Sequence, residues 1–300
     1  MSRVLRTVWL GSVPYRAAWA LQRRLAQALR SAELDSDCLL LLEHPPVYTM
    51  GRSGRPQHLP EGVERLRRLG ADYLTVDRGG SITFHGPGQL VAYPIVRVAG
   101  AFPMGASGLH GDVIRYLRAL EEAVIVVVAG LGVRAGRRPP FTGVWVGDSQ
   151  SRKLAAIGLK VAGGVTTHGV ALNVNTELQW FDHIIPCGIE GAGVTSLRQE
   201  GVSQATPLDV ASPFAAALAR ELGEELALAD EQLDQLTHEV LASSGALPAG
   251  NGRTSGHLVY HGASERSSVR TPILRTSPRA DGGSRGERPW ERQPATAYSS

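Results

Sequence analysis

The chain has 300 residues, of which 43% are apolar, and carries a formal net charge of +3. This length and composition are typical of one large globular domain or two small ones. The apolar stretch at residues 124–133 is too short to span a membrane, and we expect it to be the buried half of a helix. The first 13 residues lack the long apolar region and cleavage site of a signal peptide, so we expect a cytoplasmic protein.

The positive charge is unevenly distributed. Residues 246–300 contain eight Arg and four acidic residues, so residues 1–245 carry a net charge of about −1. The larger part therefore offers no evident nucleic-acid-binding footprint. From residue 245 onward Gly, Ser, Pro and Arg dominate and apolar periodicity ends, which predicts a disordered tail over 245–300. Two cysteines without a CxxC motif argue against a disulfide framework or a zinc site.

In the first half of the chain, residues 3–13 alternate as a strand does, and residues 15–33 have apolar residues at helical spacing. Residues 38–51 are an apolar run interrupted by two prolines, which predicts a buried strand that ends in a turn. Cys38 would be an inert core residue of that strand. Residues 72–98 predict three strands separated by glycine turns.

In the second half, the pattern predicts two helices flanking a group of strands. The expected elements are a helix over 109–132, a strand over 142–147, strands on either side of Ala162-Gly163-Gly164, and helices over 213–226 and 230–243. Strands in meanders with inserted helices are typical of an α/β or α+β fold with a mixed, largely antiparallel sheet flanked by helices.

Cys187 stands in the sequence Pro-Cys-Gly at a predicted bend. A thiol is a nucleophile as its thiolate, the glycine leaves room for a substrate, and backbone N–H groups of such a turn can face a developing oxyanion. The alternative interpretation is a buried core cysteine. The local pattern favours the functional interpretation.

Lysine is rare in this chain, because 29 of its 31 basic residues are Arg and only Lys153 and Lys160 are Lys. Unlike Arg, Lys can give up its proton when buried. An ammonium about 4 Å from a thiolate contributes roughly 4 kcal/mol at an effective dielectric near 20, which lowers a thiol pKa by up to about three units. Alternation along a strand puts the two lysines on opposite faces, so only one of them can serve a given site. The residues alone leave the choice open.

Glycine-rich residues 78–89 would let the backbone approach a ligand closely, although they match no nucleotide-binding motif. His85 within them is a candidate base, ligand donor or turn-bracing residue. His168 marks a second His-Gly corner, and His44 before two prolines is expected to be structural.

Five segments occur together in one order: LLLLEHPPVYTMGR, DRGGSITFHGPGQLVAYPI, RKLAAIGLKV, TTHGVALNVNTEL and IIPCGI…VTSL. With them, residues 5–228 resemble the lipoyl(octanoyl) transferases, in the superfamily of the biotin and lipoate protein ligases. The resemblance implies an α/β fold around an acyl tunnel, with residues 1–244 as the catalytic domain. It implies an acyltransferase that moves octanoyl from acyl carrier protein, through a cysteine thioester, to a lysine of lipoyl domains, the first step of endogenous protein lipoylation.

The resemblance also implies roles for individual residues. Cys187 matches the acyl-thioester nucleophile and Lys153 the lysine that depresses the thiol pKa. The substrate-binding positions would be Arg78, Gly79, Gly80, Ser81, Ile82, Thr83, Phe84, His85, Ala156, Ile157, Gly158, Gly169, Val170 and Ala171. No metal, ATP or other cofactor is implied. The acceptors would be the E2 subunits of 2-oxoacid dehydrogenases and the glycine cleavage H protein, with no nucleic-acid or membrane partner.

Three alternatives remain at this stage. An ATP-dependent lipoate or biotin ligase shares the fold but needs no cysteine nucleophile. A non-catalytic protein that binds carrier domains would leave both thiol and lysine inert. A cysteine hydrolase would need a histidine paired with the cysteine, and no histidine is singled out by its sequence context.

Overall fold

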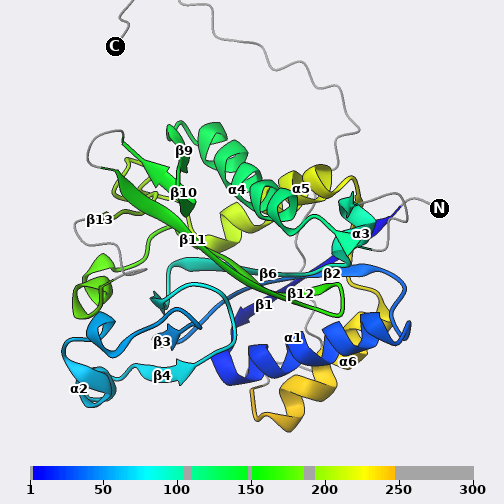
Figure 1. Cartoon of the computed structure of the whole chain (residues 1–300), viewed down its shortest axis with the longest axis horizontal. Helices are drawn as coiled ribbons and strands as arrows, with labels where there is room; N and C mark the ends of the chain where they lie inside the picture. The colour runs from blue at the N-terminus through cyan, green and yellow to red at the C-terminus, as the bar shows by residue number, and fades with distance from the viewer. Residues whose placement is uncertain (1–2, 105–109, 148–150, 186–192, 247–300) are drawn as a thin grey trace, which may run out of the picture. The chain divides into compact units, whose positions relative to one another are not determined.

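The computed structural model describes residues 3–104, 110–147, 151–185 and 193–246. Cys187 and residues 247–300 lie outside the described residues. A nine-stranded mixed sheet forms the centre of the described part (Figure 1). In order across the sheet its strands are β14 (Glu225–Leu228), β1 (Val4–Ser12), β2 (Asp37–Glu43), β6 (Gln89–Ile95), β12 (Val165–Asn173), β11 (Arg152–Ala162), β10 (Phe141–Val146) and β9 (Ala135–Arg138), with β13 (Gly193–Val194) paired to β11 off this path.

Two helix pairs cover the sheet, one pair on each face (Figure 1). Helices α1 (Tyr15–Arg30) and α6 (Glu231–Ser243) pack on one face, and α4 (Val113–Gly130) and α5 (Pro207–Leu222) pack on the other. Helix α1 buries Ala18, Leu21, Leu25 and Leu29, which recur every three or four residues as an amphipathic helix requires. Each face of the sheet therefore has its own apolar core.

A small three-stranded sheet adjoins one end of the large one. It contains β4 (Asp72–Thr75), β3 (Val47–Met50) and β5 (Ile82–His85). Its core includes Tyr48, Phe84 and Phe181. The remaining elements are η1 (Pro56–His58), α2 (Gly62–Arg68), α3 (Val98–Ala101), β7 (Pro103–Met104), β8 (His110–Gly111) and η2 (Leu178–His183). The loop between β4 and β5 lies against β11, where the candidate site is found.

The predicted fold class is confirmed, since most neighbouring strands are antiparallel while β1 pairs in parallel with both β2 and β14. The predicted hairpin is β11–β12. Its turn residues Gly163 and Gly164 both have positive φ, 57° and 77°, which suits a tight turn of the kind that favours glycine. Cys38 is fully buried in β2, as expected.

Two predicted elements differ from the structure. The run 38–51 is not one strand that ends in a turn: after the prolines a second strand, β3, joins the small sheet. The helix predicted over 213–226 begins at Pro207, because Thr206 and Asp209 form a capping box there, and Pro213 lies inside it. It ends at Leu222, where Gly223 adopts the left-handed conformation, and the segment from Glu225 becomes β14.

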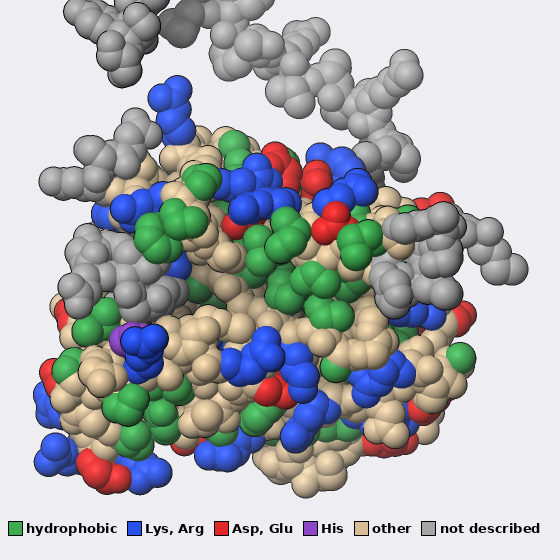
Figure 2. All heavy atoms as spheres, viewed as in Figure 1, with side chains coloured by type: hydrophobic (Ala, Val, Ile, Leu, Met, Phe, Trp, Pro, Cys, Tyr) green, Lys and Arg blue, Asp and Glu red, His purple; other side chains and the backbone are tan. Residues whose placement is uncertain are grey.

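The surface charges are mixed in sign. On the face drawn in Figure 2, Lys and Arg side chains lie in small groups beside Asp and Glu side chains. Ion pairs on exposed or partly exposed side chains include Arg24 with Glu33 and Arg67 with Glu64. Within the described ranges, no helix combines the length and the hydropathy that crossing a membrane requires.

Candidate functional site

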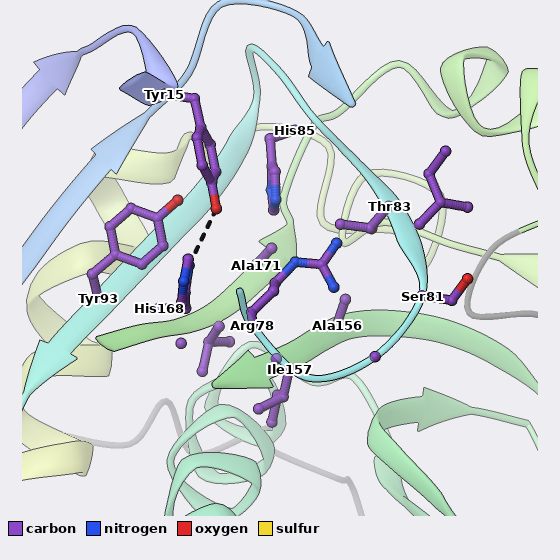
Figure 3. A pocket seen from close by; sticks show the side chains of 15 residues that line it. Tyr15, Arg78, Ser81, Thr83, His85, Tyr93, Ala156, Ile157, His168 and Ala171 are labelled. Atoms are coloured by element: carbon purple, nitrogen blue, oxygen red, sulfur yellow. Dashed lines mark hydrogen bonds between the residues drawn. The ribbon is translucent and has the colours of Figure 1, made fainter. Parts of the chain in front are cut away.

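A cavity of about 50 Å³ lies where the loop before β5 meets β11, β12 and the start of α1 (Figure 3). Apart from His168, its wall is apolar along β11 and β12, and its polar residues come mainly from the loop before β5, from β5 and from the start of α1. The lining residues are Tyr15, Arg78, Gly80, Ser81, Ile82, Thr83, His85, Tyr93, Ala156, Ile157, Gly158, His168, Gly169, Val170 and Ala171. We call this space the inner cavity.

The inner cavity brings together the three segments that the sequence singled out. Of the substrate-binding positions expected from the resemblance, all but Gly79 and Phe84 line it. The backbone N–H of Gly79 donates to the carbonyl of Leu159, which ties the loop to β11. The Phe84 ring lies in the core of the small sheet, stacked on Trp180 at 5.1 Å. Neither these two residues nor Leu159 forms part of the cavity wall.

Arg78 is the one arginine among the described residues of the inner-cavity wall, and it is 7% exposed. One terminal nitrogen, Nη2, donates to the carbonyl and the hydroxyl of Thr49, at 2.6 and 2.8 Å. Two glycines make room for it: a Cβ on Gly51 would lie 2.7 Å from Nη1, and one on Gly158 would lie 3.1 Å from Cδ. The glycines of β11 and of the segment after β3 thus allow a fixed positive charge beside the cavity.

A chain of hydrogen bonds leads from the inner cavity toward the surface. The Tyr15 hydroxyl lies 3.2 Å from His168 Nδ1 (Figure 3), and His168 Nε2 lies 2.8 Å from Asp77, which also accepts from Lys160 at 2.6 Å. The backbone of His168 has a φ of 61°, an uncommon conformation for a residue other than glycine, and its N–H donates to Gln22 at 2.7 Å. Strained residues of this kind cluster at functional sites.

Two more buried histidines belong to this region, His85 in the cavity wall and His44 beside it. His44 hydrogen-bonds the carbonyl of Val13 at 2.6 Å and the Tyr93 hydroxyl at 2.7 Å, and His85 lies 2.8 Å from Gln89. Burial lowers the pKa of His44 to about 4, although its bond to Val13 acts in the opposite direction. Burial, together with the charges of His44 and Arg78, holds the pKa of His85 well below its ordinary value. Both rings are therefore neutral near pH 7.

The buried neutral His44 makes folding stability depend on pH. Because its pKa is lower in the folded chain than in the unfolded one, the unfolded chain takes up the proton first as the pH falls. Its contribution to stability is thus fully present above about pH 6.5 and is lost as the pH falls to about 4. A shift from 6.5 to about 4 corresponds to roughly 3 kcal/mol.

We expect His44→Gln to remove that part of the pH dependence. The measurement is the free energy of unfolding in urea at pH 7 and pH 4.5 for both proteins. For each protein, the free energy of unfolding at pH 4.5 is subtracted from that at pH 7, and the two results are compared. This comparison cancels the contributions of other groups. One of these is Glu224, whose pKa burial raises to about 8 and whose contribution has the opposite sign. Equal pH dependence in the two proteins would contradict the assignment.

A second, more open cavity of about 530 Å³ adjoins the first, and the two share Gly80, Ser81 and Ile157. We call it the outer cavity. Its other lining residues are Ser53, Arg55, His58, Pro140, Phe141, Thr142 and Lys153. Lys153 is 8% exposed, and its ammonium lies 4.6 Å from the centre of the Trp145 ring. This places a largely desolvated lysine at the wall of the outer cavity.

Lys160 lies in a different environment. It pairs with Asp77 at 2.6 Å and lines neither the inner nor the outer cavity. Hydrogen bonds from Lys160 and His168 hold the pKa of Asp77 near 2, against the effect of its partial burial, so this carboxyl is ionised at pH 7. Of the two lysines, the structure brings only Lys153 to the outer cavity.

The sequence of residues 14–219 matches the model of the lipoyl protein ligase A/B catalytic domain. This match covers more than half of the chain. The chain belongs to the lipoyl protein ligase A/B catalytic domain family.

Relatives within this family carry a consistent name. The chain is 53% identical over 192 residues to the octanoyltransferase of Rubrobacter xylanophilus, covering 63% of this chain and 80% of that protein. It is 46% identical over 228 residues to the octanoyltransferase of Chloroflexus aurantiacus, covering 75% and 96%. It is 48% identical over 222 residues to the mitochondrial octanoyl-[acyl-carrier-protein]:protein N-octanoyltransferase of Xenopus tropicalis, covering 73% and 87%.

Solved structures of lipoate protein ligases share the fold. The bipartite ligase of Thermoplasma acidophilum superposes with a TM-score of 0.59 at 16% identity, covering 80% of this chain and 92% of that one. A lipoate-protein ligase A bound with ATP superposes with a TM-score of 0.59 at 15% identity, covering 81% and 95%. At these identities the likeness concerns the fold alone.

Several cavity residues of this family member are not among the positions expected from its sequence. Tyr15 and Tyr93 reach the inner cavity from α1 and β6, and Arg55, His58 and Phe141 line the outer one. None lies in a glycine-rich motif or carries a distinctive spacing. Their contribution depends on contacts between distant parts of the chain, such as Tyr15 with His168, 153 positions apart.

Proposed function

We propose that this chain is an octanoyltransferase that moves an octanoyl group from acyl carrier protein to a lysine of a lipoyl domain. The observation that carries the proposal is the position of Lys153, one of only two lysines, at a cavity that adjoins a narrower, largely apolar one. The names of the relatives support it. The acceptors would be the lipoyl domains of 2-oxoacid dehydrogenase E2 subunits and the H protein of glycine cleavage.

In the proposed reaction, the thiolate of Cys187 attacks the thioester of octanoyl carrier protein, and the carrier thiol leaves. The lysine of the lipoyl domain then attacks the new enzyme thioester, and an amide forms as the Cys187 sulfur departs. Lys153 supplies the positive charge that favours the thiolate and exchanges protons with the attacking and leaving groups. Arg78, fixed by Thr49, adds a second positive charge beside the reacting carbonyl.

The octanoyl chain would occupy the inner cavity against β11 and β12. Ile82, Ala156 and Ile157 provide apolar contacts there, and the glycines leave room for the chain. Burial of about seven methylene-sized units at roughly 0.8 kcal/mol each contributes about 5–6 kcal/mol to binding before ordering costs. No part of this scheme requires a metal or a nucleotide.

The test is transfer of octanoyl from octanoyl carrier protein to a purified lipoyl domain in the presence of EDTA and without ATP, followed by intact-mass analysis of both proteins. We expect the lipoyl domain to gain one octanoyl group at a lysine and the enzyme to carry an acyl group transiently. Transfer that depends on free octanoate with ATP and Mg²⁺ would instead indicate a ligase of the same fold. Absence of any acylation would indicate a protein that only binds carrier domains.

Acyl-chain length offers a further prediction. Ala156 is half-buried on β11 and lines the inner cavity, so Ala156→Leu fills space that the chain would occupy. Loss of room for two methylenes corresponds to about 1.6 kcal/mol, or roughly a 15-fold shift in preference from octanoyl toward hexanoyl carrier protein. The measurement is kcat/KM for both donors. The matched control is Ala162→Leu at the exposed end of the same strand, which should keep the original preference.

A further inference from the structure

His58 and Ser81 form a hydrogen-bonded pair at the junction of the two cavities. His58 Nδ1 lies 2.5 Å from Ser81 Oγ, and both residues line the outer cavity, while Ser81 also lines the inner one. An acyl chain in the inner cavity with its carbonyl toward Lys153 would therefore place that carbonyl near Ser81. The proposed function gives this histidine no role. It uses Lys153 to stabilise the Cys187 thiolate and the apolar residues of the inner cavity to bind the acyl chain.

The hydrogen bonds determine which nitrogen of His58 carries the proton. The backbone N–H of Arg55 donates to Nδ1 at 3.3 Å, so Nδ1 is an acceptor and the neutral ring carries its proton on Nε2. The Ser81 hydroxyl then donates to Nδ1, which leaves the lone pairs of Oγ available to accept a hydrogen bond. In this arrangement a serine oxygen at the cavity wall is backed by a basic nitrogen, the arrangement used for general-base catalysis.

The backbone holds this pair in place from both sides. The carbonyl of Ser81 accepts from the N–H of Gly51 at 3.1 Å, at the start of the β5 pairing with β3. The carbonyl of His58 accepts from the N–H of Ile185 at 2.9 Å. Ser81 is 5% exposed, whereas His58 is only partly buried. The serine can therefore face a bound group while the histidine remains in reach of solvent, to which it can release a proton.

The charges of the outer cavity favour deprotonation of a further ammonium. Among the residues that the structure describes, the charged side chains that line it are those of Arg55 and Lys153, both basic. An acceptor lysine that enters this cavity arrives as a third cation. Like charges nearby disfavour the protonated form of an amine, so the acceptor loses its proton more readily there than in water. A nearby base that accepts this proton is still required, because an ammonium has no lone pair with which to attack.

We propose that the Ser81–His58 pair removes the proton from the acceptor lysine before it attacks the enzyme thioester. The ammonium gives a proton to Ser81 Oγ as the Ser81 proton passes to His58 Nδ1. The free amine then forms the C–N bond, the C–S bond breaks, and the second amine proton goes to the departing sulfur. His58 returns its proton to solvent. The inference rests on the proposed function and assigns the pair to its second half-reaction alone.

The two half-reactions can be measured separately. Octanoyl-enzyme formation from octanoyl carrier protein is followed by intact mass, and transfer from isolated octanoyl-enzyme to a lipoyl domain is followed in single turnovers from pH 6.5 to 9.5. The variants are Ser81→Ala, His58→Gln and the double variant. The control is His238→Gln, an exposed histidine on α6, which should behave as the parent in both steps.

We expect transfer to the lipoyl domain to slow about 100-fold at pH 7 in both single variants, and thioester formation to fall much less. The deficit should shrink as the pH rises, because the free-amine fraction of a lysine grows about tenfold per pH unit below its pKa. The double variant should be no slower than either single variant, since each removes the same relay. Thermal unfolding identifies any variant that fails to fold. If His58→Gln does not fold, Ser81→Ala still tests the proposal, because it also removes the hydrogen bond between the two side chains.

Each other outcome overturns the proposal. Transfer at the parental rate in both variants would show that Lys153 alone suffices. An equal loss in both half-reactions, or a deficit that does not change with pH, would show a structural role only. If the parent chain itself forms no octanoyl-enzyme, the proposed function fails and this inference fails with it, whereas failure of the variants alone to show a deficit leaves the proposed function intact.

Discussion

Cys187→Ala is expected to form no octanoyl-enzyme and to lose transfer by at least about 10³-fold, because the variant lacks the group on which the acyl chain would be carried. The matched control is Cys38→Ala, the same substitution at the other cysteine. Cys38 is fully buried in β2, and burial raises the pKa of its thiol to about 12, so it stays protonated and unreactive. We expect this control to capture one octanoyl group as the parent does.

Intact-mass analysis after mixing with octanoyl carrier protein measures both variants directly. Peptide mapping of the acylated parent then locates the group, which should be on residue 187. An octanoyl thioester that persists in Cys187→Ala, or one that is lost in Cys38→Ala while the protein remains folded, would contradict the assignment of the nucleophile. Iodoacetamide labelling against pH offers a second measurement, since one thiol should react near neutral pH and the other should not.

Much of the site could be predicted because its segments carry local signals. A Cβ on Gly158 would lie 2.9 Å from the carbonyl oxygen of Gly79, and Gly80 has a positive φ of 84°. Both situations favour glycine, which is visible in the sequence. The hairpin between β11 and β12 carries its own turn residues, Gly163 and Gly164. Features that a few neighbouring residues determine are readable without the fold.

Phe84 was expected to bind substrate because the whole segment 78–85 was, but it does not line the cavity. Successive side chains of a strand point to opposite faces, so in β5 Thr83 and His85 share one face and Phe84 lies on the other. Applied to residues 83–85, this alternation separates Phe84 from Thr83 and His85, in agreement with its place in the core of the small sheet. A predicted binding segment that forms a strand should therefore be divided by face.

His58 could not be predicted, for a different reason. It lies on η1, a short helical turn outside any glycine-rich motif. It becomes a candidate functional residue only because it hydrogen-bonds Ser81, 23 positions away in the sequence. Tyr15 is likewise predicted from the sequence only as the first residue of an amphipathic helix. Its contact with His168 of β12 is seen only in the fold. Side chains that depend on long-range contacts leave no local pattern, and the fold has to be known before they can be found.

Lys153→Arg is expected to leave a folded protein that transfers octanoyl about 10³-fold more slowly. Arginine keeps the positive charge and the contact with Trp145, which lysine now makes at 4.6 Å. It does not give up its proton, however, so it cannot exchange protons with the attacking and leaving groups. The matched control is Lys160→Arg at the only other lysine, where the ion pair with Asp77 can be kept. We expect the control to stay within about threefold of the parent.

A third variant, Lys153→Met, separates the two roles of this lysine. It removes the positive charge as well as the exchangeable proton, so the Cys187 thiol should react with iodoacetamide only at higher pH. In Lys153→Arg the charge remains, and the dependence of labelling on pH should stay close to that of the parent. Octanoyl transfer should be lost in both. Parental turnover in Lys153→Arg would remove the proton-transfer role. An unchanged labelling profile in Lys153→Met would remove the electrostatic one, because a thiol held ionised by a neighbouring ammonium must respond to its loss.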